Sequence, residues 1–168
     1  MVINMKKIYV VSLIFFLIDL VSKILITSYE KSLPLTVINN FFYLDKVTNE
    51  GAAFSMFTGY TIALILVTIF VLIYIHKYII KDIKRKLGYF SLSMLVGGIL
   101  GNLFDRIVYG KVIDFLSFNI FGYNFPIFNL ADTFICIGVF LLIIDYIRSD
   151  KHENNRRKWK SKNRCIFS

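Results

Sequence analysis

Two aspartates, Asp114 and Asp132, stand among apolar residues, where a free carboxylate is costly to bury. Asp114 lies within Val-Ile-Asp-Phe, and Asp132 ends the run Phe-Asn-Leu-Ala-Asp. Two carboxyl groups that meet in a medium of low dielectric raise each other's pKa and tend to share one proton. Such a pair can hydrolyse a peptide: the carboxylate takes a proton from water, and the carboxylic acid polarises the scissile carbonyl. Spacing alone leaves this a hypothesis, because two aspartates at this separation are common in proteins.

Other polar residues fall inside or at the ends of long apolar blocks, where ionisable groups are functional candidates by default. These residues are Asp19, Lys23, Asn102, Asp105, Arg106 and Asn129. Each also has a structural explanation. The first two are four residues apart and can pair on one helix face. The adjacent Asp and Arg can be a charge cluster at a helix end, and the asparagines can hydrogen-bond between helices.

Motifs for several other reactions are absent from the sequence. It has no His-Glu-x-x-His zinc helix, no cluster of cysteine and histidine, no Gly-x-Ser-x-Gly elbow and no phosphate-binding Gly-Lys-Thr loop. The cysteines, Cys136 and Cys165, are divided between an apolar block and the charged tail, so we expect no internal disulfide.

The elements that must hold these residues are four long apolar blocks. Hydrophobic residues make up 57% of the 168 residues, and the mean hydropathy is +0.64, higher than is usual for a soluble domain. Each block approaches the roughly 20 residues that a helix needs to cross a bilayer. We predict an all-α integral membrane protein with four transmembrane helices, at about 8–27, 60–78, 87–104 and 125–147. Residues 1–150 would form one membrane-embedded domain, and 151–168 a basic tail. Gly97, Gly98 and Gly101 are spaced for close helix approach.

The basic residues indicate how these helices are oriented. The formal net charge is +9, and 15 of the 20 lysines and arginines flank the helices on one side. They are Lys6, Lys7, Lys77, Lys81, Lys84, Arg85, Lys86, Arg148, Lys151, Arg156, Arg157, Lys158, Lys160, Lys162 and Arg164. Both termini are therefore expected in the cytoplasm. We assign this charge to membrane flanks and expect no nucleic-acid binding.

Two segments, about 28–59 and 105–124, would then face outward. The middle of the first, 37–47, is rich in aromatic and branched residues, which favours short strands or an interfacial segment. A wider aromatic stretch, 37–57, could rest on the membrane and clamp a substrate.

The depth of the polar residues can be read from their positions along these helices. Asp19 lies about 17 Å along the first helix, and Asn102 lies about 23 Å along the third, both running outward. Asp132 lies at a similar height near the start of the fourth helix, which runs inward. The polar residues are thus predicted to share one layer near the outer face, within reach of Asp114.

Five short motifs follow one another along the chain. They are Asp19-Leu20-Val21-Ser22-Lys23, Asn49-Glu50-Gly51-Ala52-Ala53-Phe54, Gly101-Asn102-Leu103-Phe104-Asp105-Arg106, Val112-Ile113-Asp114-Phe115 and Phe128-Asn129-Leu130-Ala131-Asp132. With these motifs the sequence resembles the bacterial lipoprotein signal peptidases, or signal peptidase II, over nearly all of the chain before the tail. One departure is Leu20, where many members have Gln, which puts a polar contact of the first helix in doubt.

The resemblance implies a membrane aspartic endopeptidase that removes the signal peptide of a prolipoprotein by cleavage just before a cysteine carrying diacylglycerol. By motif position, Asp114 and Asp132 correspond to the catalytic pair. The family's residues that shape the site or contact the substrate correspond here to Asn49, Gly51, Asn102, Arg106 and Asn129. Its residues of structural support correspond to Asp19, Lys23 and Asp105.

The resemblance also implies that no metal or organic cofactor takes part. The expected partners are lipidated prolipoproteins and membrane lipids, and the expected state is a monomer. The expected location is the bacterial cytoplasmic membrane, with the active site near its outer face.

Two alternatives compete with a peptidase. A small transporter or channel subunit could use the intramembrane acids as a proton relay, although the one-sided polar layer and the lack of an inverted repeat disfavour it. A catalytically inactive scaffold of the same fold is disfavoured by the intact pair Asp114 and Asp132.

Overall fold

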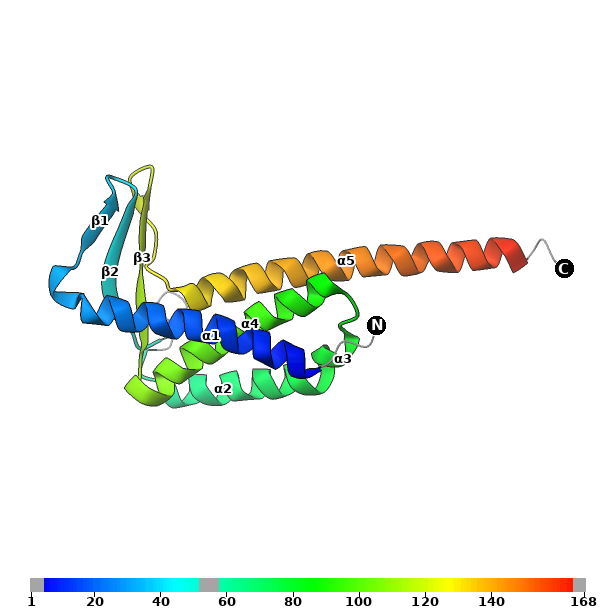
Figure 1. The fold of residues 1–168 in the computed structure, drawn as a ribbon, viewed down its shortest axis with the longest axis horizontal. Coiled ribbons are helices and arrows are strands. Elements are labelled where there is room, and N and C mark those ends of the chain that lie inside the picture. The colour runs from blue at the N-terminus through cyan, green and yellow to red at the C-terminus, as the bar shows by residue number, and fades with distance from the viewer. Residues whose placement is uncertain (1–4, 52–57, 165–168) are drawn as a thin grey trace.

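The computed structural model describes residues 5–51 and 58–164, which form a helical bundle with a small sheet across one end (Figure 1). The long helices are α1 (Met5–Ser28), α2 (Thr61–Tyr74), α4 (Lys86–Tyr109) and α5 (Leu130–Arg164). The short ones are η1 (Glu30–Ser32), the π-helical turn η3 (Ile75–Ile79) and α3 (Ile80–Asp82), the last two continuing α2. Within the described residues, four segments are long and apolar enough to cross a membrane: Met5–Ser28, Thr61–Asp82, Lys86–Tyr109 and Leu130–Ser149. The four predicted helices are therefore present, each with the length and composition of a membrane span.

The outer surface of the bundle is apolar. On α2, Ile62 is 75% exposed and Phe70 is 67% exposed, and this helix buries none of its residues. Ile14 of α1 and Phe140 of α5 are exposed as well. An apolar surface this extensive is unfavourable in water and suits helices surrounded by lipid.

Helix α4 lies between α1 and α5 and contributes more buried residues than any other element of the described chain. A Cβ atom on Gly97 would lie 2.6 Å from the carbonyl oxygen of Ser12 in α1, and one on Gly98 would lie 2.4 Å from the carbonyl oxygen of Ala131 in α5. A Cβ atom on Gly101 would likewise lie 2.4 Å from a carboxylate oxygen of α1. No larger residue fits at these positions, so the prediction that these glycines allow close helix approach is confirmed.

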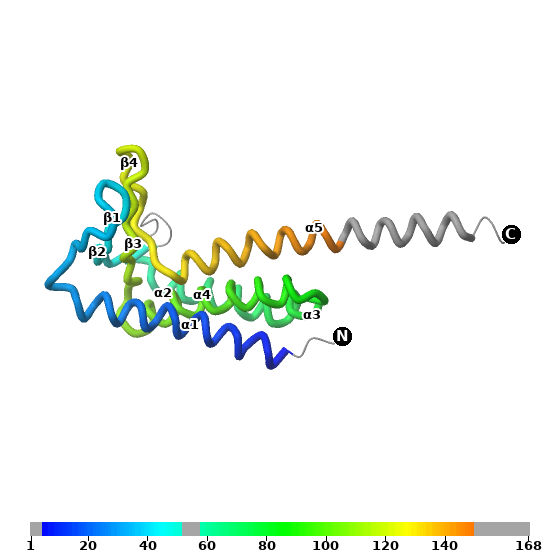
Figure 2. Tube along the Cα trace, turned by 45° about the horizontal axis from the view of Figure 1, so that its top comes forward, coloured from blue at the N-terminus to red at the C-terminus, as the bar shows by residue number. Residues whose placement is uncertain are grey.

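The sheet stands across the end of the bundle where α5 begins, away from the end where α1 begins and α5 ends (Figures 1 and 2). It is antiparallel, in the order β1 (Leu35–Ile38), β2 (Phe42–Asn49), β3 (Val112–Ile120) and β4 (Tyr123–Asn124). The strands predicted within 37–47 are confirmed by β1 and β2. The all-α description is too simple, because β3 and β4 come from 105–124, a segment in which no strand was predicted.

The pairing of β2 with β3 brings distant parts of the chain together. Asn49 pairs with Val112, and Val47 pairs with Asp114. The register shifts between Leu44 and Val47, just before these pairs. One sequence motif from each outward segment therefore lies at the base of the sheet, directly over the bundle.

Two helix ends differ from the predicted boundaries. Helix α4 runs on to Tyr109 and ends at Gly110, whose left-handed conformation (φ 73°) lets its N–H donate to the Arg106 carbonyl oxygen at 3.1 Å. Asp105 and Arg106 thus lie inside the helix rather than at its end. Helix α5 begins at Leu130, not near 125, because residues 125–128 pair with β3.

Helix α5 also continues to Arg164, past the end predicted near 147. The added part is polar and basic, and Lys, Arg and Glu are good helix formers even where no apolar face is present.

Candidate active site

Asp114 and Asp132 line one cavity of about 540 Å³ between the base of the sheet and the ends of α4 and α5 that lie next to it. Three further polar residues predicted from the sequence, Asn49, Asn102 and Arg106, line the same cavity. Most of the remaining wall is apolar: Val112, Phe125, Pro126, Ile127, Phe128, Ile135 and Ile137, together with Thr133 and Cys136. The cavity therefore combines a small polar floor with a large apolar wall.

The start of helix α5 sets the position of Asp132. Asn129 is the residue before the helix, and its Oδ1 accepts a hydrogen bond from the Asp132 N–H at 2.8 Å. In return, Asp132 Oδ2 accepts from the Asn129 N–H at 3.3 Å. This reciprocal pair is a capping box, which fixes the helix end and the carboxylate together.

Asn129 also reaches the second carboxylate. Its Nδ2 donates to Asp114 Oδ1 at 2.7 Å, and Asn49 Nδ2 donates to Asp114 Oδ2 at 3.1 Å. Asn129 therefore contacts both aspartates, one through its main chain and one through its side chain, and the pair converges as predicted from the sequence.

The environment of Asp114 favours a bound proton. Its residue is 3% exposed, and burial is the main reason that its pKa rises to about 6. The charge of Asp132 raises this pKa further, whereas the hydrogen bonds from Asn49 and Asn129 and the charge of Lys23 lower it. Asp114 consequently titrates close to neutral pH.

Behind the cavity, a buried ion cluster joins α1 to α4. Lys23 Nζ lies 2.7 Å from Asp19 Oδ2 and 2.8 Å from Asp105 Oδ2, and each of the three residues is at most 2% exposed. The acids also accept main-chain hydrogen bonds: Ala131 N–H donates to Asp19 at 2.8 Å, and Ile113 N–H donates to Asp105 at 3.2 Å. The cluster thereby connects α1 and α4 with the start of α5 and with β3. This geometry fits structural support.

Asn102 joins the ion cluster to the cavity. Its Oδ1 accepts from Lys23 Nζ at 3.2 Å and from Asn129 Nδ2 at 3.1 Å, and its Nδ2 donates to Asp132 Oδ1 at 2.7 Å. An unbroken chain of hydrogen bonds thus runs from the buried lysine to one of the two aspartates.

Arg106 supports the segment after β2. Its Nη2 donates to the Gly51 carbonyl oxygen at 2.8 Å, and Gly51 N–H donates to Asn49 Oδ1 at 2.9 Å. Gly51 itself is buried beside the cavity but is not part of its lining. The rest of this motif, residues 52–54, and the end of the aromatic stretch, 55–57, lie outside the described residues.

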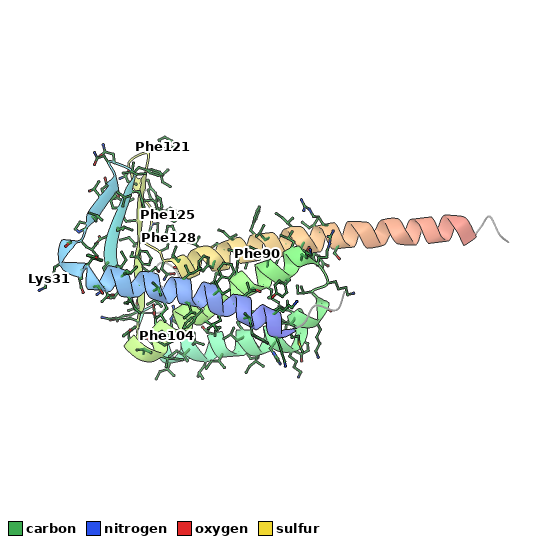
Figure 3. All side chains as sticks on the ribbon, in the orientation of Figure 1. Lys31, Phe90, Phe104, Phe121, Phe125 and Phe128 are labelled. Atoms are coloured by element: carbon green, nitrogen blue, oxygen red, sulfur yellow. The ribbon has the colours of Figure 1, made fainter. Side chains whose placement is uncertain are left out.

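The apolar wall was not predicted from the sequence. Cys136 follows Asp132 by one helical turn, so helical periodicity alone would place it on the same face of α5. Phe125 and Phe128 lie alongside β3 in the segment that leads into α5 (Figure 3), and the main chain of both residues hydrogen-bonds to that strand. Within the described part of the chain, no three His, Cys, Asp or Glu side chains are placed to share a metal ion.

Comparisons with known proteins agree with this arrangement. The family model described as signal peptidase (SPase) II matches residues 11–148. The chain is 37% identical over 147 residues to a lipoprotein signal peptidase of Halalkalibacterium halodurans, covering 85% of this chain and 93% of the relative. It is 41% identical over 149 residues to a lipoprotein signal peptidase of Ralstonia nicotianae, covering 80% of each.

Solved structures give the same picture. A bacterial membrane enzyme determined by the in meso method at 2.3 Å superposes with a TM-score of 0.80 at 33% identity, covering 88% of this chain and 92% of that one. A second, determined by the same method at 1.9 Å, gives a TM-score of 0.72 at 33% identity over 84% and 93%. These matches leave the transporter alternative without support. The chain belongs to the signal peptidase II family.

Proposed function

We propose that the protein is an aspartic endopeptidase that removes the signal peptide from prolipoproteins, with Asp114 and Asp132 as its catalytic pair. The observation that carries this proposal is the cavity in which both carboxyl groups converge beneath an apolar wall. Relatives at 37–41% identity are lipoprotein signal peptidases, and a substrate of that class carries both a peptide bond and acyl chains. The polar floor of the cavity suits the peptide bond, and the apolar wall suits the acyl chains.

In the proposed reaction Asp114 is the acid and Asp132 the base. Asp132 takes a proton from water as the water oxygen attacks the scissile carbonyl carbon, and Asp114 gives its proton to the carbonyl oxygen. The tetrahedral intermediate then collapses: Asp132 protonates the leaving nitrogen, and Asp114 recovers its proton. A pKa near 6 suits Asp114 for this role, because the group both holds and releases a proton close to neutral pH.

The remaining polar residues of the cavity would hold the substrate backbone. A peptide group without hydrogen-bond partners is costly in an apolar setting, and Asn49 and Arg106 offer donors beside the two carboxyl groups, whereas Asn102 shapes the site through its bond to Asp132. The exposed side chains of Cys136 and Ile137 lie at the edge of the apolar wall on the lipid-facing side of α5, so acyl chains would enter sideways from the bilayer.

The same proposal includes a topology. Both termini would face the cytoplasm and the sheet would face outward from the bacterial cytoplasmic membrane, since most basic residues flank the bundle at the end away from the sheet. Residues 1–150 would act as a monomeric membrane domain in contact with lipids, and 151–168 would be a cytoplasmic tail. Phe121→Cys, at the exposed tip of the β3–β4 hairpin, should react with an impermeant maleimide added outside intact cells. Labelling only after lysis would mean that the sheet faces the cytoplasm, contrary to the proposed orientation.

The activity is tested by reconstituting the purified protein with a diacylglyceryl-modified prolipoprotein, with the unlipidated precursor as a substrate control. Asp114→Asn and Asp132→Asn should each lower kcat at least about 1,000-fold, because either change removes one half of a pair that acts as a unit. Asp82→Asn, at an exposed position of α3, is the matched control and should cleave normally. Robust cleavage by either cavity variant would remove the assignment of the pair.

A further inference from the structure

The amide of Asn102 stands between two groups of opposite hydrogen-bonding character. On one side is Lys23 Nζ, which is only a donor, and on the other is the carboxylate of Asp132, which is an acceptor when ionised. The amide has an acceptor oxygen at one end and a donor NH₂ at the other. Only one of its two orientations therefore satisfies both neighbours.

The reverse orientation would be strongly unfavourable. Turning the amide by 180° would place its NH₂ against the ammonium of Lys23 and its oxygen against the carboxylate of Asp132. It would also break the bond in which Asn129 Nδ2 donates to Asn102 Oδ1 at 3.1 Å. Asn102 is 8% exposed, so water could replace little of what is lost.

Lys23 is itself held firmly in place. It lies between Asp19 and Asp105 at 2.7 and 2.8 Å, and its residue is 2% exposed. The other charged groups near it line a second cavity of about 660 Å³ on the far side of the cluster: Glu30, Lys46 and Lys111. Lys46 is paired with Glu30 at 2.6 Å. On the side of Asp132, Arg106 contacts the main-chain oxygen of Asn102 at 3.3 Å. The ammonium of Lys23 is thus the charged group that donates to Asn102 Oδ1.

We propose that Lys23 is a positioning residue for the peptidase reaction: by donating to Asn102 Oδ1 it fixes the amide so that Nδ2 always faces Asp132. This inference rests on the proposed role of Asp132. With the amide fixed, Asp132 receives a 2.7 Å hydrogen bond that holds its carboxylate toward the cavity. Without Lys23, only Asn129 Nδ2 of the two donors to Asn102 Oδ1 remains, so the amide is held less firmly and part of the population presents an oxygen to that carboxylate.

The test is a double-mutant cycle on kcat for lipidated substrate, with Lys23→Met, Asn102→Ala and the two combined. Each single change should lower kcat about 10- to 100-fold, with KM changed less than about 3-fold. Because Lys23 acts through Asn102, the combined variant should be no more than about 3-fold slower than the slower single variant. Losses that multiply would overturn the proposal, since a residue that only supports the fold has no reason to couple to this amide.

Folding is controlled separately, because Lys23→Met leaves two buried carboxylates without their cation. Asp19→Asn/Lys23→Met removes one charge of each sign, and the new amide oxygen can still accept from the Ala131 N–H. A second double-mutant cycle uses Asp19→Asn as its reference protein. In this cycle, Asp19→Asn/Lys23→Met takes the place that Lys23→Met has in the first. Ser12→Ala, a buried change on α1 away from the cluster, should keep the kcat of the unmodified protein.

The outcomes separate the two proposals. No cleavage by the unmodified protein, or cleavage by Asp114→Asn, would reject the peptidase function itself. If the unmodified protein cleaves normally but the losses in kcat multiply in both cycles, only the role of Lys23 would be rejected. Failure of Asp19→Asn/Lys23→Met to fold, while Asp19→Asn folds, would also reject it, because Lys23 would then be a structural residue.

Discussion

At the scale of single residues, the two proposed catalytic acids are held by different neighbours. Asp114 is almost fully buried and accepts hydrogen bonds from two asparagine side chains, whereas Asp132 is half-buried and bonded to one side chain and one main-chain N–H. Depth along the predicted helices was enough to place the polar layer. The contact between Asn49 and Asp114 was not predictable, because it depends on the pairing of β2 with β3, which joins residues far apart in the sequence.

Removing the Asn49 amide should move the pH dependence of cleavage. The Asn49 hydrogen bond lowers the pKa of Asp114 from the value that burial alone would give. If Asp114 works as the acid, kcat/KM falls as pH rises through its pKa, near 6 in the unmodified protein. Asn49→Ala should raise that pKa and shift the falling limb to higher pH, in addition to lowering the maximal rate. A limb that stays in place or moves to lower pH would argue against Asp114 as the acid.

The same group should make stability depend on pH. The pKa of Asp114 is about 6 when folded, against an ordinary value of 3.8, so the folded protein binds more protons than the unfolded chain between these limits. Stability is therefore lost as pH rises through this window, by up to about 3 kcal/mol. Asp114→Asn lacks the titration, so its Tm should rise relative to the unmodified protein between pH 4 and pH 7. A difference in Tm that is constant over this range would contradict the raised pKa.

At the scale of elements, four helices and a sheet meet at one layer of polar residues, and different interactions determine where the helices and the strands form. The helices were predictable because each apolar block has the length that hydrocarbon requires, and α1 matches its predicted span closely. The capping box of Asn129 and Asp132 was also readable as an Asn-x-x-Asp pattern before an apolar run, and it would have corrected the start of α5. Strand β3 was missed because its partner β2 comes from another part of the chain, and β4 was missed because it has only 2 residues, which pair with β3.

The close contact of α4 with α5 makes Gly98 a sensitive position. Alanine in an open helix position is more favourable than glycine by about 1 kcal/mol. At Gly98, however, a Cβ atom would lie 2.4 Å from the Ala131 carbonyl oxygen and 2.9 Å from Ile135 Cγ1. Gly98→Ala should therefore destabilise the protein by about 1–3 kcal/mol and lower kcat, since it pushes away the helix start that carries Asp132. Ile107→Ala, on the exposed face of the same helix, is the control. Unchanged Tm and kcat in Gly98→Ala would show that the contact can relax.

At the scale of the whole molecule, the proposed topology would place the hydrolytic chemistry where lipid and water meet. The polar layer lies at the end of the bundle next to the sheet, and the cavity wall is formed by apolar residues of α5 and of the segment before it. For a substrate anchored by acyl chains, the wall would lengthen the contact beyond the scissile bond and contribute apolar burial that a peptide alone cannot provide.

Cys136 gives a direct test of that route into the cavity. Its thiol is exposed on α5, lines the cavity and lies one helical turn from Asp132. In a Cys165→Ser background, a lipid-soluble maleimide should modify Cys136 and abolish cleavage of lipidated substrate, because the adduct occupies space that the substrate needs. Cys136→Ser in the same background should cleave with or without the reagent. Prior addition of excess substrate should slow the modification. Complete modification with full activity would mean that substrate reaches the two aspartates by another path, and the apolar wall would then need a different explanation.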